Sequence, residues 1–269
     1  TSITLAATSD TSNAWYNGNN HTYVGWLWDA GTGSPVSNTD GSITSSVKAS
    51  QSAGFSIVSY SGALSGAGSS SIGHGLGAVP SLILVKNRDT TDNWVVYNQY
   101  VGNAAYLMLN SANSPATGSS MWGNTTPTST TFTAGFASQA NQSGHDYIAY
   151  CFTPVEGYSS IGKYSGNGDP DGPFVYTGFR VAWLMVKNVD TSGEPWTIYD
   201  STRDPYNLAT HRLRPDSYGG EESGTAARDK DLLSNGFKVR GTSGEQNTDG
   251  DDYIYLAFAE NPFKTARAR

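Results

Sequence analysis

Cysteine, charged residues and strong helix formers are all scarce in this chain of 269 residues. The single cysteine, Cys151, excludes an intrachain disulfide framework. Charged residues make up 14% of the sequence, against about 25% in an average soluble protein. No apolar run reaches the roughly 18 residues that a membrane-spanning helix needs, so we expect no membrane insertion.

The residues that replace them favour β structure. Threonine, valine and the 16 tyrosines and 7 tryptophans suit pleated strands, while the 31 glycines, with asparagine and serine, suit turns. The abundance of aromatic residues and the low charge argue against disorder. The formal net charge of −7 argues against a nucleic-acid partner, because affinity for phosphates comes mainly from lysine and arginine.

Several aromatic, strand-length runs recur along the chain. Residues 145–152 and 251–258 are two such runs, each preceded by a turn rich in Asn and Gly or Ser, and residues 21–28 form a third. Residues 82–87 (LILVKN) likewise match residues 183–188 (WLMVKN). Cys151 falls within one of these runs, at a position that takes small or apolar residues, so we expect a buried, unreactive thiol.

This pattern predicts an all-β protein of tandem β-sandwich, jelly-roll-like repeat units. The predicted organisation is a partial hairpin of a preceding unit, a linker rich in Gly, Ser and Thr, two β-sandwich units and a short tail, at residues 1–30, 31–53, 54–153, 154–263 and 264–269.

Longer motifs resemble a repeat domain of structural proteins of tailed bacteriophages, often marine phages, that are described as tail-fibre or virion-structural proteins. The motifs include GFSIVSY (54–60), GHGLG (73–77), YIAYCF (147–152), YSGNG (164–168), DGPFVYTGF (171–179) and AFAENPF (257–263). The resemblance spans nearly the whole chain. It implies a virion component that is oligomeric and C-terminal in a longer chain, and phage fibres in general suggest a homotrimer. It carries over no catalytic or binding residue.

Three residues in polar or glycine-rich segments are candidates for ligand contacts. Trp15 and Trp122 are flanked by turn residues, unlike the tryptophans on predicted strands, so we interpret them as candidate exposed contacts for sugars. His74 lies in the Gly-rich segment 73–77; a loop role and a ligand contact are both open for it. That segment lacks a Walker or Gly-x-Gly-x-x-Gly pattern and so does not indicate phosphate binding.

Acidic turns raise two further hypotheses. Calcium takes several oxygen ligands from flexible loops, and Asp169, Asp171, Asp249 and Asp251 are candidate ligands for it; we expect no other cofactor. Paired carboxylates also occur in glycosidases, but carboxylates two residues apart on a turn do not define a cleft. No nucleophile–base motif is present, so we expect no enzymatic activity.

The sequence therefore predicts a tail-fibre or tail-tip domain, located in the virion, that recognises a host-surface glycan or protein and contacts other virion proteins. A head fibre or capsid decoration protein without a receptor role is the alternative. A glycan depolymerase is a third possibility and would need two carboxylates that meet in a cleft.

Overall fold

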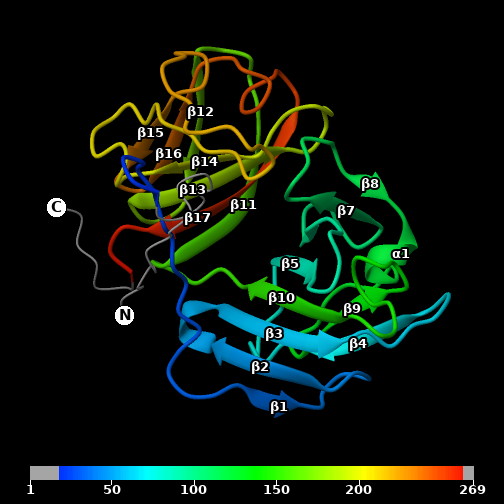
Figure 1. The fold of residues 1–269 in the computed structure, drawn as a ribbon. Helices are drawn as coiled ribbons and strands as arrows, with labels where there is room; N and C mark the ends of the chain where they lie inside the picture. Colours follow the sequence, from blue (N-terminus) through cyan, green and yellow to red (C-terminus); the bar gives the residue numbers. More distant parts are fainter. Residues whose placement is uncertain (1–17, 263–269) are drawn as a thin grey trace.

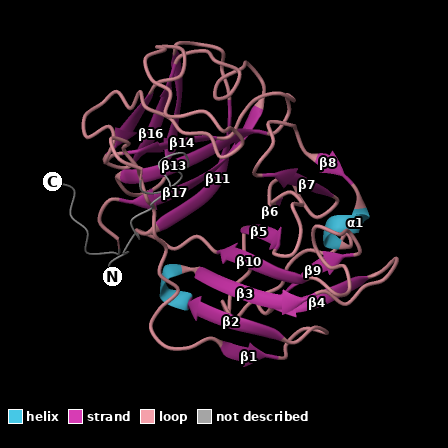
Figure 2. Ribbon diagram, viewed as in Figure 1, coloured by secondary structure: helices cyan, strands magenta, loops and turns pink. Residues whose placement is uncertain are grey.

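The structure is a computed structural model that describes residues 18–262. Antiparallel strands form almost all of its regular structure (Figure 2), which confirms the predicted all-β class. The helical segments among the described residues are a 3-10 turn, η1 (Gln51–Ala53), and a single α-helical turn, α1 (Ser119–Trp122). No helix within residues 18–262 is long and apolar enough to cross a membrane.

The first unit, residues 36–152, contains the largest sheet. Its strands are β1 (Val36–Asn38), β2 (Ser45–Ser50), β3 (Phe55–Ser61), β5 (Leu82–Asn87), β6 (Val95–Asn98), β7 (Ala105–Met108), β8 (Ala116–Thr117) and β10 (Asp146–Phe152). They are ordered β1-β2-β3-β10-β5-β6-β7-β8. A second, two-stranded sheet pairs β4 (Ser69–Gly73) with β9 (Thr131–Gly135).

The second unit, residues 159–259, contains a four-stranded and a three-stranded sheet. The four-stranded sheet is formed by β11 (Ser159–Ser165), β13 (Val181–Asn188), β14 (Thr197–Asp200) and β17 (Asp252–Ala259). Its order is β11-β17-β13-β14. The three-stranded sheet is formed by β12 (Asp171–Tyr176), β15 (Lys230–Leu233) and β16 (Gly236–Arg240), with β16 in the middle.

The central strands of the two units follow the same order, β3-β10-β5-β6 in the first and β11-β17-β13-β14 in the second. Their registers also correspond. Tyr147 lies opposite Tyr60, with ring centroids 5.2 Å apart, and Tyr253 lies opposite Tyr164 at 5.0 Å. Positions in one unit can therefore be compared with positions in the other.

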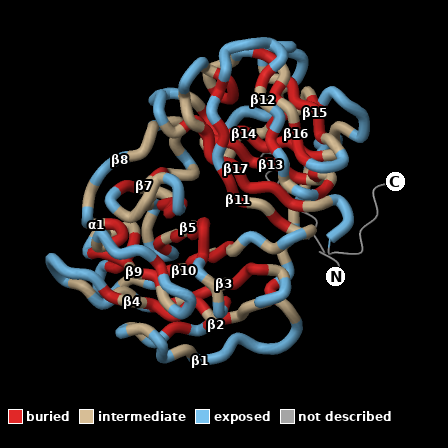
Figure 3. The backbone as a smooth tube through the Cα atoms, turned by 180° about the vertical axis from the view of Figure 1, so that it is seen from behind, coloured by how far each residue is buried: buried red, intermediate tan, exposed pale blue. Residues whose placement is uncertain are grey.

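Three apolar cores separate four layers of sheet. One core fills the space between the eight-stranded sheet and the β4–β9 pair, and another lies between the four-stranded and three-stranded sheets. The third joins the two large sheets, and so the two units, through residues such as Phe55, Phe152, Trp183, Leu256 and Phe258. Figure 1 shows the second unit above the first, and Figure 3 shows buried residues along the strands of both units and exposed residues mainly on the outer loops.

Hydrogen bonds reinforce this junction between the units. Trp196 Nε1 donates to the main-chain oxygen of Met108 at 2.9 Å, and Lys187 Nζ donates to that of Ala112 at 3.0 Å. Both donors are buried in the second unit, whereas both acceptors belong to the first. The two units are thus packed against each other and are not joined merely by a flexible linker.

Two predicted segments have a different structure from the one expected. Residues 31–53, expected to be a linker, contain β1 and β2, which extend the sheet beside β3. The reason is that Ser45 and Val47 alternate with exposed residues and point into the core.

The described part of the expected N-terminal hairpin, residues 18–30, contains no strand; residues 1–17 lie outside the described part of the chain. Instead of pairing with another strand, Trp28 packs edge-on against Trp183 and Phe258 of the second unit. The predicted tail, 264–269, also lies outside the described residues.

Candidate binding surfaces

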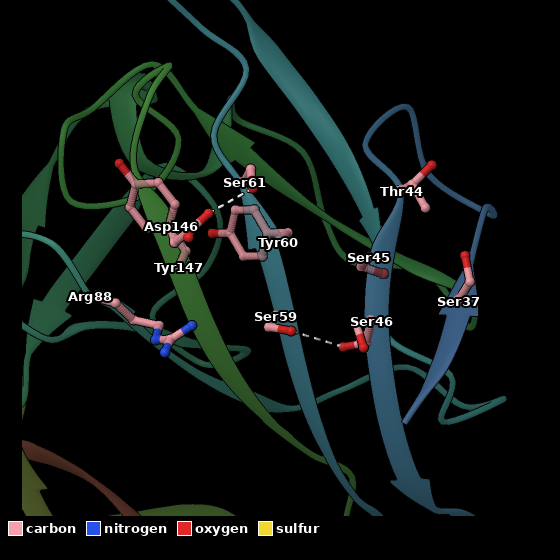
Figure 4. Close-up of a pocket in the computed structure, with 10 residues that line it drawn as sticks. All are labelled: Ser37, Thr44, Ser45, Ser46, Ser59, Tyr60, Ser61, Arg88, Asp146 and Tyr147. Carbon is pink, nitrogen blue, oxygen red and sulfur yellow. Dashed lines mark hydrogen bonds between the residues drawn. The ribbon is translucent and has the colours of Figure 1, made fainter. Parts of the chain in front are cut away.

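A groove of about 380 Å³ lies on the polar end of the eight-stranded sheet (Figure 4). It is lined mainly by hydroxyl-bearing residues, of which Ser45, Tyr60 and Tyr147 are buried, together with one cation and one carboxylate: Ser37, Thr44, Ser45, Ser46, Ser59, Tyr60, Ser61, Arg88, Asp146 and Tyr147. The register of the strands explains this composition, because residues directly opposite one another point to the same face of a sheet. Asp146 lies opposite Ser61, and Ser59 lies opposite Ser46.

The groove begins where contact with the second unit ends. Phe55 and Ile57, earlier on β3, belong to the core between the units. Ser59 and Ser61 follow on the same face at the period of two that a strand imposes. The same strand thus buries its apolar half against the second unit and presents its hydroxyl half to solvent.

Asp146 is the carboxylate that lines the groove. It accepts a hydrogen bond from Ser61 Oγ at 2.7 Å, and its backbone nitrogen donates to Asp89 at 2.6 Å. Arg88, on the neighbouring strand end, donates its backbone nitrogen to the Asp146 main-chain oxygen at 2.8 Å. The Arg88 guanidinium itself forms no ion pair with Asp146, which leaves both charged groups available to a ligand.

A second candidate surface is the outer face of the three-stranded sheet. Phe174 and Tyr176 alternate on β12 with the buried Val175, and 47% and 67% of their surfaces are exposed. Gly236, opposite Tyr176, has no side chain to cover the ring. A Cβ at Gly236 would lie 2.1 Å from the Val175 oxygen, so the close approach of the two strands requires glycine there.

Charged side chains border this aromatic face. Lys238, opposite Phe174, and Arg240 both contact the carboxylate of Asp171, and Arg240 also pairs with Asp231 at 2.7 Å. The corresponding face of the first unit is different, since β4 presents Ser69 and Ser71. Exposed aromatic rings on this face are therefore specific to the second unit.

The predicted contact residues in the first unit need correction. Trp122 is only 1% exposed and packs edge-on against Tyr97, because the helical turn α1 directs it into the core despite its polar flanks. His74 is also buried. Its Nε2 lies 3.1 Å from the Thr128 oxygen, and its Nδ1 accepts from the Leu76 nitrogen at 3.2 Å.

Because Nδ1 accepts a hydrogen bond, the imidazole is neutral, and its two bonds hold the loop in place. Burial lowers the pKa of His74 accordingly. Neither Trp122 nor His74 is placed to contact a ligand. Trp15 lies outside the described residues.

The four predicted calcium ligands lie on two neighbouring segments, Asp169 and the first residue of β12, Asp171, on one and Asp249 and Asp251 on the other. The segments are joined by a hydrogen bond, since Gly166 N donates to Asp251 O at 2.8 Å. Their carboxylates nevertheless have different surroundings. Asp171 binds Arg240, and hydrogen bonding to Lys238 lowers its pKa. Asp251 accepts from Asn188 and Thr191, Asp169 accepts from the Asp171 nitrogen, and Asp249 is exposed. Within residues 18–262, no group of three His, Cys, Asp or Glu side chains could hold a metal ion.

A buried charge network lies below the loop that joins β14 to β15. Arg212 pairs with Glu222 and with the buried Glu245. Lys230, fully buried, donates to Gln246 and lies 4.0 Å from the centroid of the Tyr199 ring. Burial lowers the pKa of Lys230 to about 7. Since Lys230 has no exposed surface, we assign this network to anchoring the loop and not to ligand binding.

The model of a family described as a domain of unknown function (DUF7483) matches residues 2–262. No curated protein and no solved structure matches the chain.

Proposed function

The chain belongs to the DUF7483 family, a domain of unknown function, and we propose that it is a bacteriophage tail-fibre or tail-tip module that binds a glycan on the host surface. The resemblance of its long motifs to phage structural proteins supports the virion setting. The pair of exposed rings on β12, Phe174 and Tyr176, carries the binding part of the proposal.

Exposed rings on a strand suit a sugar ligand. The apolar face of a pyranose packs against an aromatic ring, while hydroxyl groups at the edge of the sugar reach polar neighbours. Here the polar neighbours are Lys238, Arg240 and Asp171, which are already oriented by their ion pairs. A single such surface would bind weakly, and an oligomer of the chain would gain avidity from several copies.

The proposal assigns no catalysis to the chain. Glycosidases generally use two carboxylates on opposite sides of the scissile bond. Asp146 is the carboxylate that lines the groove of the first unit, and the Asp171 carboxylate beside the aromatic face is engaged by Arg240. Both arrangements favour recognition of a glycan over its hydrolysis.

Binding of the fluorescently labelled chain to host cells, and to surface polysaccharide extracted from them, tests the proposal. Phe174→Ser and Tyr176→Ser should each reduce saturable binding. Phe136→Ser, which alters an exposed ring outside this face, is the matched control and should bind like the wild type. Absence of wild-type binding would overturn the proposal in favour of a capsid decoration role, and equal binding by all variants would exclude the aromatic face.

A further inference from the structure

Two cations in the first unit have no partner. Among the lysines and arginines of residues 18–262, Lys48 and Arg88 are the two that form neither an ion pair nor a side-chain hydrogen bond. The others are engaged, by carboxylates or by oxygens of main chain or side chain. In a chain with a net charge of −7, two unpaired cations on one surface are a specific feature.

Both cations lie on the face of the eight-stranded sheet that carries the groove. Arg88 lines the groove at the end of β5, beside Asp146. Lys48 lies on β2 opposite Ile57, two residues beyond Ser46 on the same face. With neighbouring strands about 4.8 Å apart and residues about 3.3 Å apart along a strand, the backbones of Lys48 and Arg88 are separated by about 20 Å of sheet. The hydroxyl groups of the groove lie between them.

The second unit offers an internal comparison for this site. Asp252 and Ser165 there correspond to Asp146 and Ser61, and they are hydrogen-bonded in the same way, with Ser165 Oγ 2.5 Å from Asp252. However, Lys163 pairs with Asp252 at 3.0 Å.

In the first unit Ser59 occupies the position of Lys163, and Arg88 occupies the position of Val189. The second unit therefore carries its cation, Lys163, in the middle of the site, whereas the first unit carries its cation, Arg88, at the rim. The space that Lys163 fills in the second unit is open in the first, and the carboxylate that it neutralises there has no cationic partner.

We infer that this groove binds an acidic oligosaccharide, with a sugar carboxylate on Arg88 and sugar hydroxyl groups on Asp146 and the serines. The planar guanidinium can hold a carboxylate through two parallel hydrogen bonds. Asp146 accepts from hydroxyl groups and repels a second carboxylate, so it orients the ligand. Lys48, further along the same face, suits a second acidic residue of the chain.

Other ligands fit the site less well. A neutral oligosaccharide would leave Arg88 and Lys48 without an anionic partner. A nucleic acid places a charge on every nucleotide and is bound by many cations, whereas this groove also carries the carboxylate of Asp146. The inference concerns a surface separate from Phe174 and Tyr176 and a ligand of different charge, so each site can fail without the other.

Calorimetric titration of the whole chain with oligogalacturonate, and with a neutral oligosaccharide of equal length, tests the inference. The wild type should bind the acidic oligosaccharide more tightly than the neutral one, with an affinity that falls as salt is added. Arg88→Gln should weaken binding about tenfold or more, and Lys48→Gln by less. Lys163→Gln, which removes the cation that pairs with Asp252 at the equivalent site of the second unit, should leave the affinity unchanged.

A second variant tests the geometry. Ser59→Lys reproduces the arrangement of the second unit, so the new lysine should pair with Asp146, fill the groove and abolish binding without lowering the melting temperature. Equal affinity for the neutral oligosaccharide would overturn the inference. So would unchanged binding by Arg88→Gln or by Ser59→Lys, or an equal loss with Lys163→Gln.

Discussion

Lys187 and Ala112 are joined by a hydrogen bond of 3.0 Å from Nζ to the main-chain oxygen, which ties the second unit to the first. The same ammonium group donates to the Glu194 oxygen at 2.6 Å. Its counterpart in the first unit, Lys86, bonds to oxygens within its own unit, those of Asn87 and Thr90. The lysine at this position therefore bonds only within its own unit in the first unit, whereas in the second unit it also bonds across the junction.

The shared core predicts that the two units unfold together. Trp196→Phe removes the bond to Met108 and leaves that oxygen without its partner, so we expect a loss of about 1–2 kcal/mol in the free energy of unfolding. Calorimetry should show one transition for the wild type and for the variant. Trp94→Phe alters the corresponding tryptophan of the first unit, whose indole makes no such bond, and should cost less. Two separate transitions would contradict this prediction.

Buried lysines predict that stability increases with pH above neutrality. Burial lowers the pKa of Lys230 to about 7 and that of Lys187 to about 8, below the value of about 10.5 in the unfolded chain. Between those values the unfolded state binds more protons, so the free energy of unfolding should rise from about pH 7 to pH 10. Above pH 10 it should fall, because burial raises the pKa of tyrosines such as Tyr164.

Denaturant titrations across this pH range measure the effect. Lys230→Met, which removes the buried ammonium group, should flatten the rise, whereas substitution of the exposed Lys163 by Met should not. A wild-type stability that is constant or decreasing between pH 7 and pH 10 would be inconsistent with the buried lysines acting in this way.

Cys151 should resist thiol reagents in the folded protein. It is fully buried, and burial raises the pKa of its thiol to about 12, so almost no thiolate exists at pH 8. We expect negligible reaction with a disulfide reagent under native conditions and complete reaction in denaturant. Rapid labelling of the native chain would show that β10 opens readily.

Asn87 and Asn188 occupy corresponding positions and should be costly to replace. Asn188 Nδ2 donates to the Gly244 oxygen at 2.8 Å and to Asp251 at 2.9 Å, and Asn87 Nδ2 donates to the Ser138 oxygen at 3.1 Å. Both side chains are fully buried. Alanine at either position should lower the free energy of unfolding by about 2–3 kcal/mol, because buried acceptors lose their donor. Asn110→Ala, at an exposed hydrogen-bonded position, is the control.

Much of the fold follows from local sequence patterns. The aromatic runs at 147–152 and 253–258 are central strands, as their strand-like composition predicts. Residues 31–53 escaped recognition because β2 is mostly polar, and its strand character depends on pairing with β3. Trp122 was misinterpreted for a related reason, since neighbouring serines do not reveal which way a helical turn directs a ring.

The candidate surfaces were harder to predict. The alternation at 174–176 is visible in the sequence, but the sequence does not say which face of the strand another layer covers. Asp146, Ser59 and Lys48 come from three strands and Arg88 directly follows a fourth, and no motif links them. A list of lysines and arginines likewise does not reveal which of them lack a carboxylate partner.

The sequence by itself determined the β class, the strand-length aromatic runs and the low charge, because these depend on residue preferences within a few positions. The tertiary structure decided which faces are buried, which cations are paired and how the two units share a core. Those properties depend on contacts between residues that are distant in the sequence, and a strand exposes or buries a side chain according to what packs against it.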